Sequence, residues 1–123
     1  MINKQDFINA IEQNIEMVRG DTMTFNFTLK GLSQSDCEAL EVEFNVSDTP
    51  SNGACITCEI DDGVDLVSYS DNTALFAVCV SPDKTKDLDL ARYYYNLQIK
   101  DEDNVLTLMR GRFTLLYDIK GEV

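Results

Sequence analysis

Apolar and polar residues alternate with a period of two along most of the chain. In residues 22–30 every second residue is apolar, and the apolar set is Met23, Phe25, Phe27 and Leu29. This alternation is typical of an antiparallel strand that has one face against a core. The pattern returns in four further segments, at residues 40–46, 56–60, 93–99 and 113–119. Residues 74–80 are apolar on both faces, which indicates a strand near the middle of a sheet.

Runs of Asp, Asn, Gly and Pro separate these strands. They occupy residues 48–53, 61–63 and 101–104, where we expect turns between neighbouring strands. Seven to eight short strands with no crossover helix between them predict an all-β fold, and specifically an antiparallel β-sandwich. A jelly roll or an open barrel is the structural alternative.

Four weaker segments complete the prediction. We expect short strands at residues 64–68 and 105–109, and Arg110-Gly111 interrupts the second of them. Residues 33–39 and 81–88 each predict a single helical turn. The second of these begins with Ser-Pro, which places proline at the first helical position.

The N-terminal segment has a helical rather than a strand pattern. Asn3 is a suitable N-cap, and Phe7, Ile8 and Ile11 then fall on one face. We therefore divide the chain into an amphipathic helix over residues 1–13 and a β-sandwich domain over residues 14–123. The apolar helix face either packs on its own sandwich or docks on a neighbouring subunit, so its three apolar residues are candidate interface residues.

The segment from Asp89 to Tyr93 narrows the type of sandwich. Its Asp-x-Ala-x-Tyr spacing is that of a tyrosine corner, in which the tyrosine hydroxyl bonds back to nearby backbone in immunoglobulin-like domains. The sequence therefore favours an immunoglobulin-like sandwich. Tyr95 follows two residues later, where an antibody domain has its second cysteine. We expect Tyr93 and Tyr95 in the core. Tyr94 then points outward beside Asn96 and is a candidate interface residue.

The net charge of −12 limits the partners. Eleven acidic residues lie in the stretch 31–83, which contains no Lys or Arg. Such a field repels phosphate backbones and anionic lipid headgroups, so we expect neither a nucleic-acid nor a membrane partner. The N-terminal residues lack a charged-then-apolar signal pattern, and no window has the length of a membrane span.

The residue types that catalysis commonly uses are sparse. The chain has no histidine, which removes the commonest general base and metal ligand. Cys55 and Cys58 are three apart on a predicted strand and so point to opposite faces, while Cys37 and Cys79 are isolated in sequence. The acidic turns lack the twelve-residue spacing of a calcium loop. We therefore expect free thiols, no metal or cofactor and no enzymatic activity.

Three stretches resemble a known family. Residues 17–25, then residues 81–88 with the tyrosine strand 93–99, and finally residues 106–113 closing with Asp118-Ile119 resemble the immunoglobulin-like domains of bacteriophage tail and baseplate proteins. The resemblance is in particular to the N-terminal domain of baseplate upper proteins. It implies a phage or prophage virion structural protein, made in the bacterial cytoplasm, that binds other phage structural proteins and forms a homo-oligomer.

A carbohydrate-binding or cell-surface-binding β-sandwich module is the alternative function. The sequence offers it little support, because the chain has no tryptophan and no predicted row of exposed aromatic residues on which sugar rings would stack.

Overall fold

The computed structural model describes residues 11–49, 53–102 and 104–117. Within these ranges nine strands form one sheet. The strands are β1 (Ile11–Glu12), β2 (Ile15–Val18), β3 (Met23–Lys30), β4 (Glu41–Ser47), β5 (Ile56–Ile60), β6 (Gly63–Ser70), β7 (Thr73–Val80), β8 (Arg92–Lys100) and β9 (Val105–Leu116). Two short helices lie in the connections between strands, α1 (Gln34–Glu38) between β3 and β4 and α2 (Pro82–Thr85) between β7 and β8. The predicted all-β class is confirmed.

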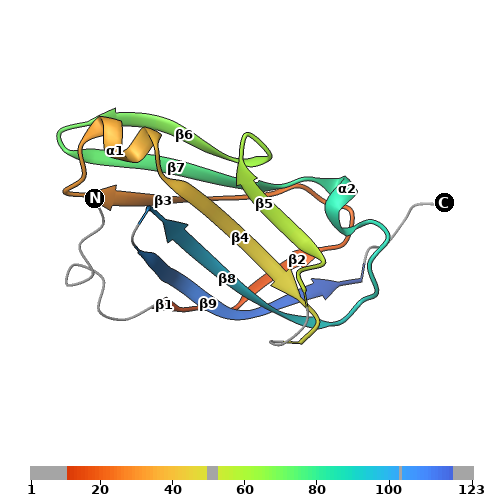
Figure 1. Cartoon of the computed structure of the whole chain (residues 1–123). Coiled ribbons are helices and arrows are strands. Elements are labelled where there is room, and N and C mark those ends of the chain that lie inside the picture. Colours follow the sequence, from red (N-terminus) through yellow and green to blue (C-terminus); the bar gives the residue numbers. More distant parts are fainter. Residues whose placement is uncertain (1–10, 50–52, 103, 118–123) are drawn as a thin grey trace.

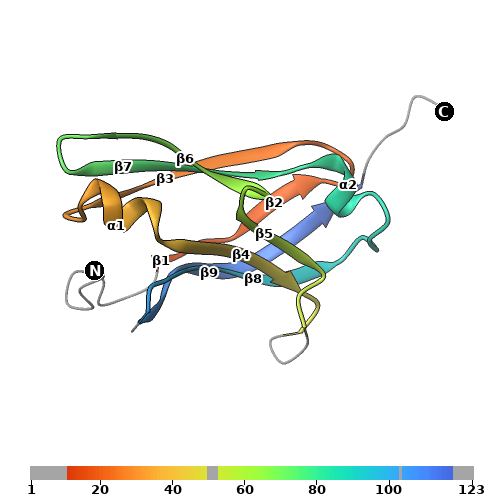
Figure 2. The same cartoon turned by 45° about the horizontal axis from the view of Figure 1, so that its top comes forward.

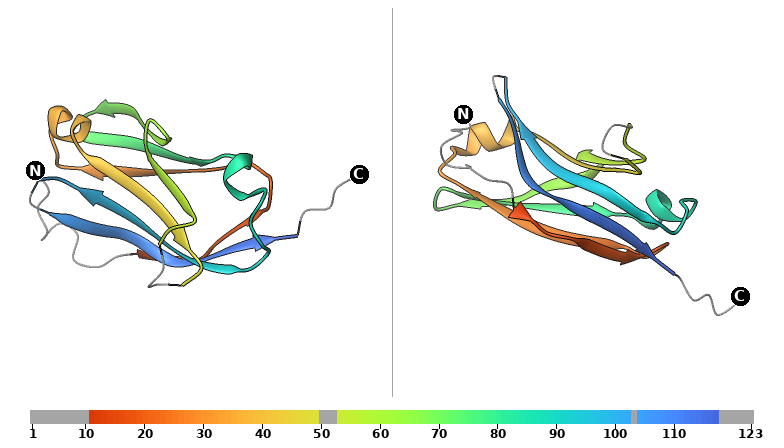
Figure 3. Two further views of the ribbon diagram at one scale, coloured as in Figure 1. Left: turned by 45° about the vertical axis from the view of Figure 1, so that its right-hand side comes forward. Right: turned by 90° about the horizontal axis from the view of Figure 1, so that it is seen from below.

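The sheet curls on itself into a barrel-like shape. Its hydrogen-bonded order is β1-β9-β8-β4-β5-β6-β7-β3, with β2 also paired to β9. As Figures 1 and 2 show, β3, β6 and β7 lie over β4, β8 and β9, and β5 lies between these two parts. The view from below in Figure 3 shows how far the two layers are twisted relative to one another.

The space between the two layers is filled by alternate side chains of the facing strands. Phe44 on β4 is fully buried, and its ring packs edge-on against Phe25 of β3 at 5.5 Å and Phe113 of β9 at 6.2 Å between centroids. Phe27 stacks on Phe76 at 5.1 Å. Offset and edge-to-face aromatic pairs add to the apolar area that is buried here. The period-two pattern thus gives each layer its inward face.

The main strands and both helical turns lie where the sequence predicts them. Ser33 caps α1 by accepting a hydrogen bond from the Asp36 backbone N–H, and Pro82 opens α2. One detail differs in β7, whose two faces are not equally covered: the even-numbered side chains are buried and the odd-numbered ones are half-exposed. Its two neighbours are β6 and the terminal strand β3.

The expectation of a purely antiparallel sheet is wrong. β1 and β2 both pair with β9 in the parallel direction, and a short parallel bridge joins β5 to β6. The alternation of apolar residues reports which face of a strand is buried but not the direction in which it runs. No hairpin joins β2 to β9, so no turn imposes an antiparallel arrangement on them.

The expected interruption at Arg110-Gly111 is also absent, because β9 runs without a break from Val105 to Leu116. Gly111 instead allows another segment of the same chain to pass close to β9. A Cβ atom at Gly111 would lie 2.3 Å from the carbonyl oxygen of Gln13. Only glycine lets the β1–β2 segment pass this close to β9.

The predicted N-terminal helix is wrong in its last part. Ile11 and Glu12 form β1, and the Gln13 N–H donates to the Arg110 carbonyl oxygen at 3.0 Å. Pairing with β9 satisfies the backbone groups that a helix would have paired internally. The sheet therefore begins before residue 14. Phe7 and Ile8 lie outside the described residues.

Candidate binding groove

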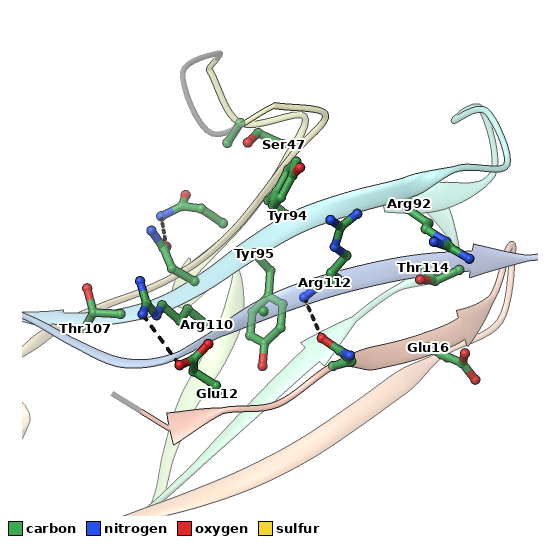
Figure 4. Close-up of a pocket in the computed structure, with 15 residues that line it drawn as sticks. Glu12, Glu16, Ser47, Arg92, Tyr94, Tyr95, Thr107, Arg110, Arg112 and Thr114 are labelled. Atoms are coloured by element: carbon green, nitrogen blue, oxygen red, sulfur yellow. Dashed lines mark hydrogen bonds and ion pairs between the residues drawn. The ribbon is translucent and has the colours of Figure 1, made fainter. Parts of the chain in front are cut away.

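An open groove of about 1240 Å³ lies on the outer surface of the β4, β8 and β9 layer. On β8, Arg92, Tyr94 and Asn96 face outward because the residues between them are buried in the core. On β9, Arg110 and Arg112 face the same way. We call the surface formed by these five residues the β8–β9 groove (Figure 4). It collects three of the chain's four arginines.

Cross-strand pairing sets the spacing of these side chains. Tyr94 lies opposite Arg112, and Asn96 lies opposite Arg110. The guanidinium carbon of Arg112 is 5.1 Å from the centroid of the Tyr94 ring, in a cation–π contact (Figure 4). This contact restrains the guanidinium above the ring and leaves it N–H donors for a carboxylate.

The three arginines differ in how far they are neutralised. Arg110 is 3.7 Å from a Glu12 carboxylate oxygen, and both side chains are largely exposed. An exposed pair at this separation is weak. Among the residues that the structure describes, no ion pair includes Arg92 or Arg112. Arg92 and Arg112 therefore carry positive charge without an ion-pair partner among the described residues, although Glu12 and Glu16 also line the groove.

One end of the groove is a ladder of amide and hydroxyl groups across three strands. The Thr57 hydroxyl on β5 donates to the Asn45 side-chain oxygen at 3.1 Å, and the Asn45 amide donates to the Asn96 oxygen at 3.4 Å. The Asn45 side chain thus turns its oxygen towards Thr57 and its NH₂ group towards Asn96. Lys100 and Glu43 pair at 3.1 Å beyond it.

Tyr95 supports the groove from below. It lies opposite Gly111, and with no side chain there its ring passes beneath β9 (Figure 4). Its hydroxyl donates to the Gln13 carbonyl oxygen. Burial raises the pKa of the Tyr95 hydroxyl above 10.0. Asn14 adds a second tie, because its side-chain oxygen accepts the Arg112 backbone N–H at 3.0 Å. The β1–β2 segment is thus held as one wall of the groove.

The residues singled out by sequence have separate positions. Tyr94 lies in the groove. The Tyr93 hydroxyl donates to the Asp89 carbonyl oxygen at 2.7 Å, which fixes the loop before β8. Burial is the main cause of the raised pKa of the Tyr93 hydroxyl. Ile11 lies in β1, beside β9.

Sequence reasoning missed the arginines of the groove. Arg92, Arg110 and Arg112 occupy outward positions on two strands joined by one hairpin, which is a readable signal. The sequence hides this signal because Arg110-Gly111 is predicted to interrupt the strand, and without a continuous strand the outward residues of β8 and β9 have no common alignment.

The cysteines and the acidic turns make local contacts within the fold. All four cysteines are unpaired. Cys58 is buried, with its thiol donating to the Cys79 carbonyl oxygen at 3.6 Å, and burial raises its pKa, whereas Cys55 is exposed. In the turn before β9, the Asp101 carboxylate accepts the Asn104 backbone N–H at 2.8 Å. Within the described ranges no group of three or more acidic or cysteine residues is placed to hold a metal ion.

Arg19 and Gly20 tie the β2–β3 connection to the segment around α2. The Gly20 N–H donates to the hydroxyl of the buried Thr85 at 2.9 Å, and the Arg19 guanidinium donates to the Leu88 carbonyl oxygen at 3.1 Å.

No helix in the described part of the chain is both long and apolar enough to cross a membrane.

Comparison with known proteins gives little to set beside this geometry. No protein-family model and no curated protein matches the chain. Among solved structures it is similar to part of a family 123 glycoside hydrolase from Clostridium perfringens, studied for glycolipid glycan hydrolysis, with a TM-score of 0.48 and 11% sequence identity. The match covers 95% of this chain and 25% of the hydrolase chain, so this chain spans about a quarter of that protein.

Proposed function

We propose that the protein is a non-enzymatic assembly domain of a phage or prophage tail or baseplate, and that it attaches to another virion protein through the β8–β9 groove. The observation that carries the proposal is the pair Arg92 and Arg112, which have no carboxylate partner among the described residues of a chain with a net charge of −12. The resemblance of three sequence stretches to tail and baseplate domains supplies the setting.

The charge distribution favours a protein partner over a long polyanion. Guanidinium groups on a sheet face bind carboxylates with two parallel hydrogen bonds. A compact acidic segment would contact the groove alone. A nucleic acid would extend past the groove and meet the repulsive field of the remaining surface. The partner we propose is therefore an acidic segment of a neighbouring structural protein.

We also propose that the fold is an immunoglobulin-like sandwich. The Tyr93 hydroxyl bonded to the Asp89 carbonyl oxygen is the contact expected of a tyrosine corner. The facing arrangement of β3, β6 and β7 over β4, β8 and β9 supports the same assignment (Figure 2).

Removing the two unpaired arginines tests the attachment. Phage particles should be purified from a strain that carries the gene, and the chain quantified in them by mass spectrometry. We expect the native chain in stoichiometric amount and the double variant Arg92→Ala/Arg112→Ala to be lost from particles while it stays folded. Lys86→Ala is the control, because it removes an exposed positive charge outside the groove. A native chain absent from particles contradicts the proposal.

A carbohydrate-binding module is the second candidate, and the open polar groove with its amide ladder favours it. Asn, Arg and Tyr side chains supply both donors and acceptors for sugar hydroxyls. Against it, Arg112 already occupies a face of the Tyr94 ring on which a sugar would stack. Screening against a glycan array separates the two functions. The second candidate would be established if the native chain binds a glycan, Tyr94→Ala abolishes that binding, and the native chain is absent from phage particles.

A further inference from the structure

The strand at one end of the sheet is open to pairing. β3 is eight residues long and pairs with β7 over its whole length without a register shift. On its other side it has no strand partner among residues 11–49, 53–102 and 104–117. Proteins protect such edges with proline, bulges, inward charges or very short strands. β3 has no proline and no bulge, and its single charge is Lys30 at the last position.

The side chains of β3 are suited to contact with another strand. On the outer face Thr24, Asn26 and Thr28 are exposed and uncharged. On the inner face Phe25 and Phe27 remain only half-buried, although both contact the core. A further strand at this edge would cover the exposed parts of both rings, and burial of apolar area is favourable.

We propose that two copies of the chain associate by antiparallel pairing of their β3 strands around a two-fold axis, so that the two sheets become continuous. A closed two-fold contact uses the same patch on both copies. The inference goes beyond the proposed function, because it involves neither the groove nor any phage partner.

Charge identifies a second copy as the occupant. Two chains of net charge −12 repel one another over most of their surfaces. Residues 22–31 contain no acidic residue, so this edge is a place where two copies approach without opposing carboxylates. In an antiparallel pair the Lys30 residues of the two copies lie at opposite ends of the contact, so these two like charges are also kept apart.

The pleat limits the register of this pairing. Directly opposite residues point to the same face, so a two-fold axis must pass beside a residue rather than between two residues. An axis beside Asn26 pairs outer residues with outer residues and apolar residues with apolar ones. The resulting pairs are Asn26 with Asn26, Thr24 with Thr28, Phe25 with Phe27, and Met23 with Leu29. Aromatic pairs and threonine pairs are favourable at such positions.

Asn26→Lys tests the contact, because the two-fold axis would bring the two new lysines directly opposite each other. By gel filtration with light scattering, we expect the native chain to have twice the 13.9 kDa mass of one copy. The variant should have the mass of one copy, with an unchanged circular dichroism spectrum. Asn26→Thr is the matched control and should remain a dimer. A native chain that is monomeric at high micromolar concentration, or an Asn26→Lys dimer, overturns the proposal.

Cross-linking tests the register independently of mass. In a background with Cys55→Ser and Cys79→Ser, which removes the exposed thiol and the thiol directly opposite Thr24, the variant Asn26→Cys should form a covalent dimer on mild oxidation. Thr24→Cys should not, because its own copy in the partner lies too far along the strand for a disulfide. Equal cross-linking of the two variants overturns this pairing. If deletion of residues 1–10 converts a monomeric native chain into a dimer, the chain's own N-terminal segment occupies the edge and the proposal fails.

These outcomes are separable from those of the proposed function. Asn26→Lys leaves the groove residues in place, and Arg92→Ala/Arg112→Ala leaves β3 unchanged. A monomer that still enters phage particles refutes the pairing alone. A dimer that is absent from particles refutes the phage role alone.

Discussion

The two ends of the sheet are built in opposite ways. At one end the segment with β1 and β2 is broken into strands of two and four residues and carries Glu12 and Glu16 on its exposed side. At the other end β3 is a single unbroken strand of eight residues with no acidic residue. Short, interrupted and charged edges resist pairing with other chains, whereas long uncharged edges invite it.

We call the end with β1 and β2 the closed end and the end with β3 the open end. The difference between them concerns function because the closed end also forms a wall of the groove. Gly111, Tyr95 and Asn14 each fix the β1–β2 segment against β9, by close approach or by hydrogen bonds. The closed end therefore positions the arginines for one kind of contact, while the open end is free for another.

Gly111→Ala should have the largest effect. The added methyl group would lie 2.3 Å from the Gln13 carbonyl oxygen, so β1 and β2 must move away from β9. Forcing atoms into a packed site costs about 1–3 kcal/mol, and we expect the upper part of that range in urea denaturation. Hydrogen exchange should accelerate in residues 11–18. Gly53→Ala is the control, because its Cβ would meet nothing within 4 Å, and equal stability of both variants would contradict the prediction.

Tyr95→Phe should have an intermediate effect. It deletes the hydroxyl that donates to the Gln13 carbonyl oxygen, and a lost hydrogen bond costs about 1 kcal/mol. Tyr93→Phe is matched to it, since it deletes a hydroxyl bonded to the Asp89 carbonyl oxygen. Hydrogen exchange should distinguish them: the first variant loosens the β1–β2 segment and the second the loop before β8. The opposite assignment, or no regional difference, would show that the two hydroxyls do not have these local roles.

The closed end also shows where sequence reasoning stops. Period-two alternation located β3, β4, β5 and β8 because each has one buried and one exposed face. It failed at β1, where a two-residue strand is too short to display a period and the nearby isoleucines and phenylalanine fit a helix. It also could not foresee that Gly111 accommodates a neighbouring backbone, since a glycine in a strand and a glycine that ends one are identical in sequence.

The candidate groove follows the same logic. Tyr94 was predicted to point outward from its strand alone. Recognising Arg110 and Arg112 as its neighbours required the register of the β8–β9 hairpin, including the shift between Leu97 and Gln98. A bulge of this kind moves every later pair by one residue, and no local pattern in this chain announces it.

Alkaline pH should weaken the closed end through Tyr95. Burial raises the pKa of its hydroxyl above the ordinary value of 10.0. Above pH 10 the unfolded chain loses this proton while the folded chain retains it. The stabilisation is complete below pH 10 and is lost as the pH rises through the folded-state pKa. Denaturation curves above pH 10 should show a shallower decline in stability for Tyr95→Phe than for the native chain, and parallel declines would contradict this.

Glu12→Gln should have the smallest effect, although it removes the one ion pair between β1 and β9 among the described residues. The Arg110–Glu12 separation is 3.7 Å, and both side chains are more than half exposed. Exposed pairs of this kind contribute about 0.2–1 kcal/mol, and this long one belongs at the lower limit. A double-mutant cycle with Arg110→Gln in urea denaturation measures the coupling. A value well above about 1 kcal/mol would mean that charge rather than backbone contact holds the β1–β2 segment, which would reverse the ranking that places Gly111 first.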